Sequence, residues 1–210
     1  MNWQSVFFDF DGVIVDSAPI KTAAFAAMFR SYGEAVEKAV VAYHLDHQGI
    51  SRFDKFRYIY EHILNIPLDE QELKVLGSDF SRLVLETVIN APYLPGVMET
   101  LIELQSLKIP AYIVSGTPED EMKYIVQRRD LSLFFNGVYG TPRKKNEIVD
   151  LILRMEQYLP PKCLFIGDSL TDYDAARNHE LCFLGIVMDS QNSPFPAGTW
   201  TSPMVTVNRL

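Results

Sequence analysis

Two aspartates, Asp9 and Asp11, follow directly after the apolar run Ser5–Phe8, and Gly12 comes next. An apolar run of this length predicts a buried strand, and in an extended chain residues two apart point the same way. Both carboxylates therefore face one site, where they repel each other unless a cation lies between them or one keeps its proton. The alternative is a strand that ends in an ordinary Asp-Gly turn.

Two later apolar runs also end in polar residues. The run 109–114 ends at Ser115, and the run 163–166 ends at Gly167 and Asp168, with Asp172 four positions further. Strands that alternate with helices predict a parallel sheet covered by helices on both faces. Ligands bind at the carboxyl ends of strands in such sheets, so we expect these polar ends to meet at one edge.

The residue types at this edge suit a phosphate and a cation. Thr117 and Pro118 predict the N-cap and the first residue of a helix. A hydroxyl beside the free N–H groups of a helix start suits a phosphate oxygen. Several carboxylates suit Mg²⁺, which takes one or two of them together with waters and a substrate phosphate.

A basic triplet, Arg143, Lys144 and Lys145, would balance the charge of a phosphate. It lies between a predicted strand at 137–140 and a predicted helix at 146–158. The other interpretation of such a triplet is a solvated surface.

A helical segment interrupts the alternating pattern. Apolar residues recur at spacings of three and four through 18–90, and the Pro- and Gly-containing segment 91–96 follows. We therefore predict an α/β protein in which 1–17 and 92–210 form a parallel-sheet core and 18–91 an inserted all-helical domain.

Composition and charge limit the kinds of partner and compartment that we expect for this protein. The chain has 210 residues and a net charge of −8, which argues against a nucleic-acid partner. No apolar run is long enough to span a membrane, and the N-terminus has no signal-peptide pattern. Cys163 and Cys182 each lie in an apolar run, so we expect reduced cysteines and a cytoplasmic protein.

Taken in order, Asp9-x-Asp11, Ser115, a later lysine and Gly167-Asp168-x-x-x-Asp172 resemble the four motifs of the haloacid dehalogenase (HAD) superfamily. The resemblance covers essentially the whole chain. The inserted segment is similar to the helical cap of the phosphoglycolate phosphatase and beta-phosphoglucomutase branch. The resemblance implies a Rossmann-like parallel sheet core with an inserted all-helical cap domain.

The resemblance also implies roles for the motif residues. Asp9 would be the nucleophile, Asp11 the general acid and base, and Ser115 a ligand of the transferring phosphoryl group. Lys145 would neutralise the charge of the nucleophile and the phosphate. Lys144 fits the pattern as well, and we expect the residue nearer the following helix to be the catalytic one.

A metal site is implied by the same motifs. Asp168 would bind Mg²⁺ together with Asp9 and the backbone carbonyl of Asp11. Asp172 would be an additional metal ligand, or it would contact the metal ligands without binding the metal itself.

Substrate contacts are expected from both parts of the chain. Gly116, Thr117 and Lys144 would bind the substrate from the core. Residues 49–52 resemble a cap segment of sugar-phosphate relatives, so Arg52 would bind the substrate from the cap. The alternative is that this segment simply begins a helix.

The expected function is a Mg²⁺-dependent phosphatase that hydrolyses a small phosphorylated metabolite, such as a sugar phosphate, through an aspartyl-phosphate. Dehalogenases of the superfamily lack the second aspartate, so Asp11 favours phosphate chemistry. The alternatives are a sugar phosphomutase of the beta-phosphoglucomutase type and a non-catalytic phosphate-binding protein. The sequence indicates no membrane partner; it leaves the oligomeric state open, and a monomer is compatible with it.

The histidines and the last residues of the chain give two further expectations. His44 and His47 are three residues apart, and we expect a solvent-facing pair rather than a zinc site. Residues 204–207 are expected to form a short final strand.

Overall fold

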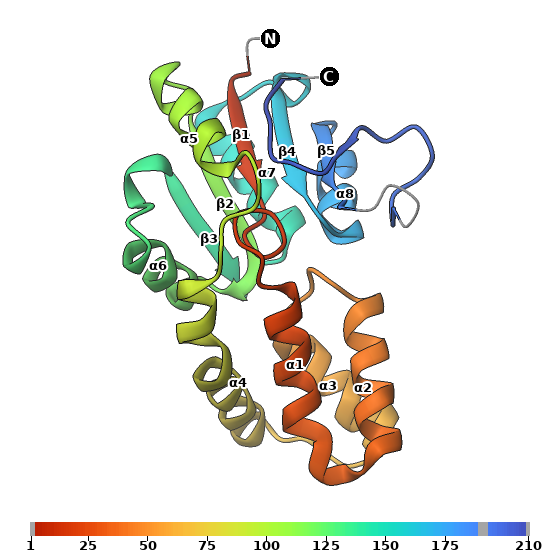
Figure 1. Cartoon of the computed structure of the whole chain (residues 1–210). Coiled ribbons are helices and arrows are strands. Elements are labelled where there is room, and N and C mark those ends of the chain that lie inside the picture. The colour runs from red at the N-terminus through yellow and green to blue at the C-terminus, as the bar shows by residue number, and fades with distance from the viewer. Residues whose placement is uncertain (1–2, 189–192, 209–210) are drawn as a thin grey trace.

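The structure, a computed structural model, describes residues 3–188 and 193–208 (Figure 1). A parallel sheet lies at one end of the molecule and a layer of helices at the other. The strands are β1 (Ser5–Phe8), β2 (Ala111–Pro118), β3 (Gly137–Thr141), β4 (Cys163–Gly167), β5 (Cys182–Ile186) and β6 (Thr201–Ser202). Their order is β3-β2-β1-β4-β5-β6. The predicted α/β fold with a helical cap is confirmed.

The helices fall into two groups. Those that follow strands of the sheet or lead into them are α5 (Val97–Ser106), α6 (Glu119–Arg128), α7 (Lys145–Glu156) and α8 (Leu170–Asn178). The cap consists of α1 (Ala18–Phe29), α2 (Glu34–Asp46), α3 (Arg52–Tyr58) and α4 (Glu70–Asn90), with the π-helical turn Ile59–Leu64 after α3. Short 3₁₀ turns lie at Arg30–Tyr32, Ser132–Phe134 and Pro160–Lys162.

Strand β1 is buried on both faces of the sheet, and its side chains alternate between two apolar layers. Phe8 belongs to the layer that continues into the cap, whereas Phe7 belongs to the layer under α7 and α8. The ring of Phe7 stacks on that of Phe165 with centroids 6.2 Å apart. A fully buried central strand needs apolar residues on both faces, which explains the continuous run that predicted it.

The cap is built around aromatic side chains. Phe25 of α1 packs against Phe56 of α3 and Phe80 of α4, with ring centroids 5.5 and 4.8 Å apart. These residues share one apolar cluster with the sheet, so the cap packs directly on the core. The division into 1–17 with 92–210 and 18–91 stays a proposal, and its boundaries fall where α1 begins and α4 ends.

The final segment differs from the expectation. The predicted strand at 204–207 is wrong, because the last strand is Thr201–Ser202, which runs parallel to β5. Val205 and Val207 are buried nonetheless. The N–H of Val205 donates to the carbonyl of Pro95, and the carbonyl of Val207 accepts from Trp3 Nε1. The segment therefore packs beside the sheet without pairing as a strand of it.

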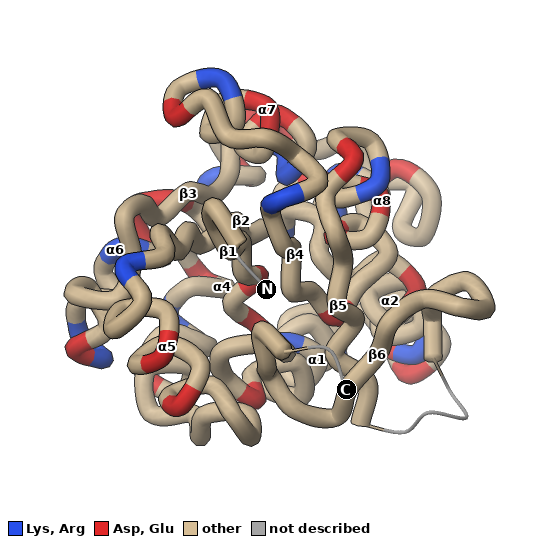
Figure 2. The backbone as a smooth tube through the Cα atoms, turned by 90° about the horizontal axis from the view of Figure 1, so that it is seen from above, with Lys and Arg blue, Asp and Glu red and all other residues tan. Residues whose placement is uncertain are grey.

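Charged residues of both signs are spread along the described chain. Basic and acidic positions are interspersed around the tube in Figure 2. Within residues 3–188 and 193–208, no helix combines the length and the apolar composition that a membrane crossing requires.

Candidate active site

The register of the sheet brings the polar strand ends together. Phe8 lies level with Ile113 of β2 and with Ile166 of β4. Asp9, the next residue, therefore lies beside the ends of both neighbouring strands, and its N–H donates to the carbonyl of Ile166 over 3.0 Å. Ser115 and Asp168 lie two residues beyond these partners. The polar strand ends thus lie together at one edge of the sheet, as expected.

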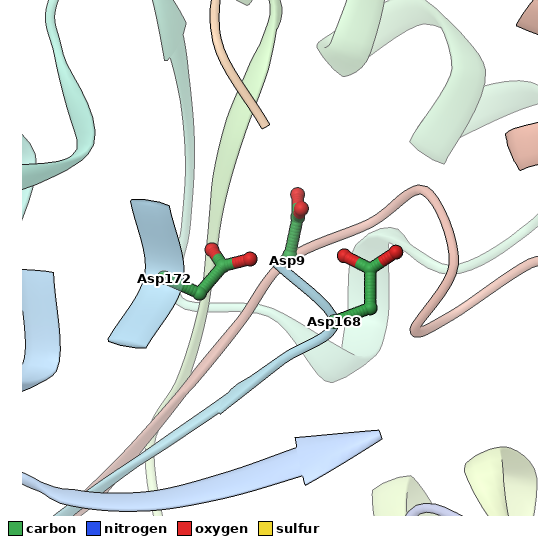
Figure 3. Close-up of side chains that lie close together, drawn as sticks. All are labelled: Asp9, Asp168 and Asp172. Carbon is green, nitrogen blue, oxygen red and sulfur yellow. The ribbon is translucent and has the colours of Figure 1, made fainter. Parts of the chain in front are cut away.

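Three carboxylates form a cluster at this edge (Figure 3). Each of Asp9, Asp168 and Asp172 offers an oxygen, and these oxygens lie within 4.8 Å of one another. Gly12 makes room for the cluster, because a Cβ at this position would lie 2.1 Å from Asp168 Oδ2. Its φ of +78° also disfavours any other residue.

Lys145 is the cation of the cluster. Its Nζ lies 2.7 Å from Asp9 Oδ2 and 2.6 Å from Asp172 Oδ1, and its side chain is buried. Lys144 is exposed instead. It lines a groove of about 560 Å³ together with Ser115 and Lys145. Of the two lysines that the sequence offered, Lys145 is thus the one in contact with Asp9.

The cluster carries more negative charge than Lys145 neutralises. Burial raises the pKa of Asp9 to about 7 against the opposing effect of Lys145, and Asp172 adds to the rise. Burial and the neighbouring Asp9 raise the pKa of Asp168 well above its usual value. Burial lowers the pKa of Lys145, but Asp172 and Asp9 outweigh it and the pKa is raised. Carboxylates crowded in this way fit a divalent cation.

The three carboxylates differ in how many hydrogen bonds they accept from the protein. Asp172 accepts from Lys145 with one oxygen and from the N–H and hydroxyl of Ser169 with the other. Asp9 Oδ1 accepts from the N–H of Phe10 over 2.7 Å. The carboxylate of Asp168 accepts no hydrogen bond from the residues described. Asp9 and Asp168 are therefore the better placed to hold a metal, and Asp172 orients Lys145.

Asp11 is bound by a separate set of groups. Its carboxylate accepts from Ser17 Oγ over 2.6 Å, forms an ion pair with Lys21 and lies 3.3 Å from Thr117 Oγ1. Burial raises the pKa of Asp11, but Lys21 and the hydrogen bonds outweigh it and the pKa is lowered. The sequence-based prediction missed Lys21. A signal existed, because Lys21 is the sole charged residue of the apolar helix α1.

The start of α6 differs from the expectation. Thr117 was predicted as the N-cap, which is wrong, because the helix begins at Glu119 and Pro118 occupies the cap position. The hydroxyl of Thr117 instead accepts from Lys21 Nζ over 2.8 Å. Ser115 Oγ accepts from the N–H of Thr117 over 3.1 Å and donates to no acceptor in the part of the chain that the structure describes. The Ser115 proton is thus available to a ligand.

A small cavity lies between these residues and the cap. Its volume is about 70 Å³. The core side of its lining includes Asp9, Asp11, Gly116, Thr117 and Asp168, and the cap side includes Lys21, Phe25, His44, Arg52, Lys55 and Phe80. A Cβ at Gly116 would lie 2.7 Å from the carbonyl oxygen of Gly49, so cap and core loops pack directly on each other.

Arg52 lies in the cavity wall but is already engaged. Its guanidinium binds Glu121 of α6 at 2.6 and 3.0 Å and Ser81 of α4 at 2.7 Å. Ser81 also donates to Glu121. The proposed contact of Arg52 with a substrate stays a prediction. The role of Glu121 was missed, since no sequence pattern links α3 to α6.

The expected solvent-facing histidine pair is wrong for His44. His47 is exposed, but His44 is buried and its Nδ1 lies 2.8 Å from Lys55 Nζ. The helical repeat explains this, because His44 follows the buried Val40 by four residues and shares its face of α2.

Comparison with known proteins agrees with the geometry. The family model for haloacid dehalogenase-like hydrolase matches residues 3–180. A phosphoglycolate phosphatase from Pseudomonas savastanoi pv. phaseolicola is 26% identical over 194 residues, which cover 82% of this chain and 65% of that protein. A phosphorylated carbohydrates phosphatase from Thermotoga maritima is 26% identical over 180 residues, covering 83% of this chain and 81% of that protein. The chain thus spans slightly less than two thirds of the first of these relatives.

A solved structure shares the fold. The beta-phosphoglucomutase from Clostridium difficile superposes with a TM-score of 0.74 at 20% identity, covering 90% of this chain and 86% of that one. Because the family model spans most of the sequence, and because the sheet edge and cap have the arrangement described above, the chain belongs to the haloacid dehalogenase-like hydrolase family.

Proposed function

We propose that this protein is a Mg²⁺-dependent phosphatase that hydrolyses a small phosphorylated metabolite through an aspartyl-phosphate. The position of Asp9 is the main support for this proposal. Asp9 is buried at the carboxyl end of β1, lines the cavity and has one oxygen 2.7 Å from Lys145 Nζ. A carboxylate held in this way has the position and the charge partner that a nucleophile toward phosphorus needs.

Asp9 would attack the phosphorus and Lys145 would offset the negative charge that gathers there. The free hydroxyl proton of Ser115 would donate to an oxygen of the phosphoryl group. Gly116 and Thr117 line the same cavity and would contact that group as well. The exposed Lys144 stays a proposed contact at the open groove.

Asp11 would handle the protons. In the first step its carboxyl would protonate the leaving oxygen, and in the second its carboxylate would activate the water that hydrolyses the aspartyl-phosphate. The contacts with Ser17, Lys21 and Thr117 hold it beside the cavity without using the cluster residues. The lowered pKa of Asp11 favours its ionised form, which suits the base of the second step, so in the first step Asp11 would pass on a proton that enters with the substrate phosphate.

Asp9 and Asp168, with the backbone carbonyl of Asp11, would hold the Mg²⁺, and Asp172 would support them. The carboxylate oxygens fit a hard cation, and the raised pKa values of Asp9 and Asp168 reflect charge that such a cation offsets. When bound, the cation supplies the positive charge that keeps these carboxylates ionised and stabilises a transferring phosphoryl group.

The names of the relatives support a small phosphorylated metabolite such as a sugar phosphate, and we propose a cytoplasmic enzyme. A sugar phosphomutase is the second candidate, because the structure resembles a beta-phosphoglucomutase. A mutase would return the phosphoryl group to the sugar, whereas a phosphatase transfers it to water.

The test is phosphate release from a panel of phosphorylated metabolites with Mg²⁺ and with excess chelator. The proposal predicts release that stops with the chelator and returns when Mg²⁺ is restored. Isomerisation of a sugar phosphate without net phosphate release would establish the mutase instead. No turnover of any ester would contradict both.

A further inference from the structure

Lys55 is a buried cation in the cap wall of the cavity without an acidic partner. Its Nζ lies 2.8 Å from His44 Nδ1, 3.3 Å from the carbonyl oxygen of His44 and 5.4 Å from the ring centroid of Phe25. The residue is 3% exposed. No carboxylate within residues 3–188 and 193–208 forms an ion pair with it.

The other cations of the cap wall are already neutralised. Lys21 forms its ion pair with Asp11, and Arg52 forms its ion pair with Glu121. Lys55 thus keeps the one uncompensated positive charge that the described cap residues place at this cavity. A buried charge without a partner destabilises a fold, and an apolar side chain would pack beside Phe25 without that penalty. The position therefore has to be explained by something outside the chain.

His44 holds the ammonium without adding charge. Its Nδ1 faces Lys55 Nζ, so the neutral ring carries its proton on Nε2. Burial and Lys55 lower the pKa of His44 to about 3. Burial and Lys21 lower the pKa of Lys55 to about 7, against the opposing effect of Asp11. An arriving anion would favour the charged form of Lys55.

We propose that Lys55, held by His44, determines specificity by binding a second anionic group at the end of the substrate remote from the reacting phosphate. The inference rests on the proposed phosphatase function. A carboxylate and a second phosphate share the required chemistry. The cavity between cap and core has a volume of about 70 Å³, so the linker between the two anionic groups is short.

The test compares two-carbon phosphate esters that differ at the far end. Ethyl phosphate has an uncharged far end. Phosphoglycolate has a carboxylate there, ethylene glycol bisphosphate has a second phosphate, and phosphoethanolamine has an ammonium group. Each is assayed with wild type, Lys55→Met and Lys55→Gln. The matched control is Lys38→Met, because Lys38 is an exposed cap lysine that pairs with Glu34.

Wild type is expected to prefer an anionic ester over ethyl phosphate and to discriminate against phosphoethanolamine. Both Lys55 variants should lower the ratio of kcat/KM for the anionic ester to that for ethyl phosphate by about 10-fold or more, and Lys38→Met should keep it. The anionic ester with the larger loss identifies the group. An unchanged ratio in well-folded Lys55 variants that still hydrolyse ethyl phosphate overturns the inference and leaves the phosphatase standing. No hydrolysis of any ester by wild type overturns both.

Discussion

Arg52 of the cap and Glu121 of the core form a two-point ion pair across their interface, with N–O distances of 2.6 and 3.0 Å. The side chains of Arg52 and Glu121 are 4% and 12% exposed, so the pair is largely shielded from water. Phe80 covers the guanidinium at 4.7 Å from its ring centroid. The pair joins α3 to α6 and would hold the cap closed over the cavity.

We predict that Arg52→Ala and Glu121→Gln lower kcat/KM on ethyl phosphate to a similar extent, about 10-fold, because each removes the same contact between cap and core. The kcat/KM of the double variant should be no lower than that of the less active single variant. A loss in Arg52→Ala with full activity in Glu121→Gln would mean that Arg52 contacts the substrate itself, as the sequence motif suggests.

The two neighbouring lysines provide a second prediction. Lys145→Met should lower kcat by about 100-fold or more, since it removes the cation 2.7 Å from Asp9 Oδ2. Lys144→Met should stay within about 3-fold of wild type, because the side chain is exposed. Steady-state kinetics on one ester compares both. Equal losses would mean that the groove beside Lys144 is also part of the reaction site.

The third prediction concerns Asp11. Because Asp11 would protonate the leaving oxygen, Asp11→Asn should lower kcat/KM on an alkyl phosphate by about 100-fold or more. On an aryl phosphate, whose leaving oxygen scarcely needs a proton, the loss in kcat/KM should be about 10-fold. Rates on ethyl phosphate and p-nitrophenyl phosphate give the comparison. Equal losses on both esters would indicate that Asp11 only positions Lys21 and Thr117.

The fourth prediction concerns stability. The pKa of Lys55 in the fold is about 7, below the usual 10.5, because burial and the charges of Lys21 and Lys145 outweigh Asp11. Between these pH values the unfolded chain binds more protons at Lys55, so the contribution of Lys55 to stability rises with pH across this window. Lys55→Met should remove this contribution to the pH dependence and stabilise the free protein at pH 7 by about 1–2 kcal/mol, raising Tm by about 2–8 °C.

Thermal unfolding at pH 6 to 9 measures this pH dependence, with Lys38→Met as the control. His44 is neutral throughout the range, since its pKa is about 3. A lower Tm in Lys55→Met at pH 7, with the wild-type pH dependence retained, would mean that the ammonium stabilises the fold.

Much of the core site follows from the sequence. The apolar strands predict a parallel sheet, and parallel strands bring Asp9, Ser115 and Asp168 to one edge whatever the details of packing. The choice between Lys144 and Lys145 did not follow, because adjacent residues at the start of α7 point in different directions. The first residue of α6 did not follow from the sequence either. The hydroxyl of Thr117, which was expected to cap the helix, binds Lys21 instead.

The cap side of the cavity could not be predicted from the sequence. Lys21, Lys55 and Glu121 lie on three helices, and their contacts depend on how the inserted segment packs on the sheet. Helical periodicity indicates only which face of each helix is buried. It would have placed His44 inside, beside Val40, but not against Lys55.

The proposed reaction depends on Asp9 as the nucleophile. The most direct measurement is acid quenching of wild type during turnover with Mg²⁺, followed by mass spectrometry of the peptide that contains Asp9. We predict a phosphoryl group on Asp9, its absence in Asp9→Asn and a fall in kcat of about 1,000-fold or more in that variant, with Asp46→Asn, at an exposed cap position, behaving as wild type. Undiminished phosphate release from well-folded Asp9→Asn, or phosphate trapped on another residue, would contradict this role of Asp9.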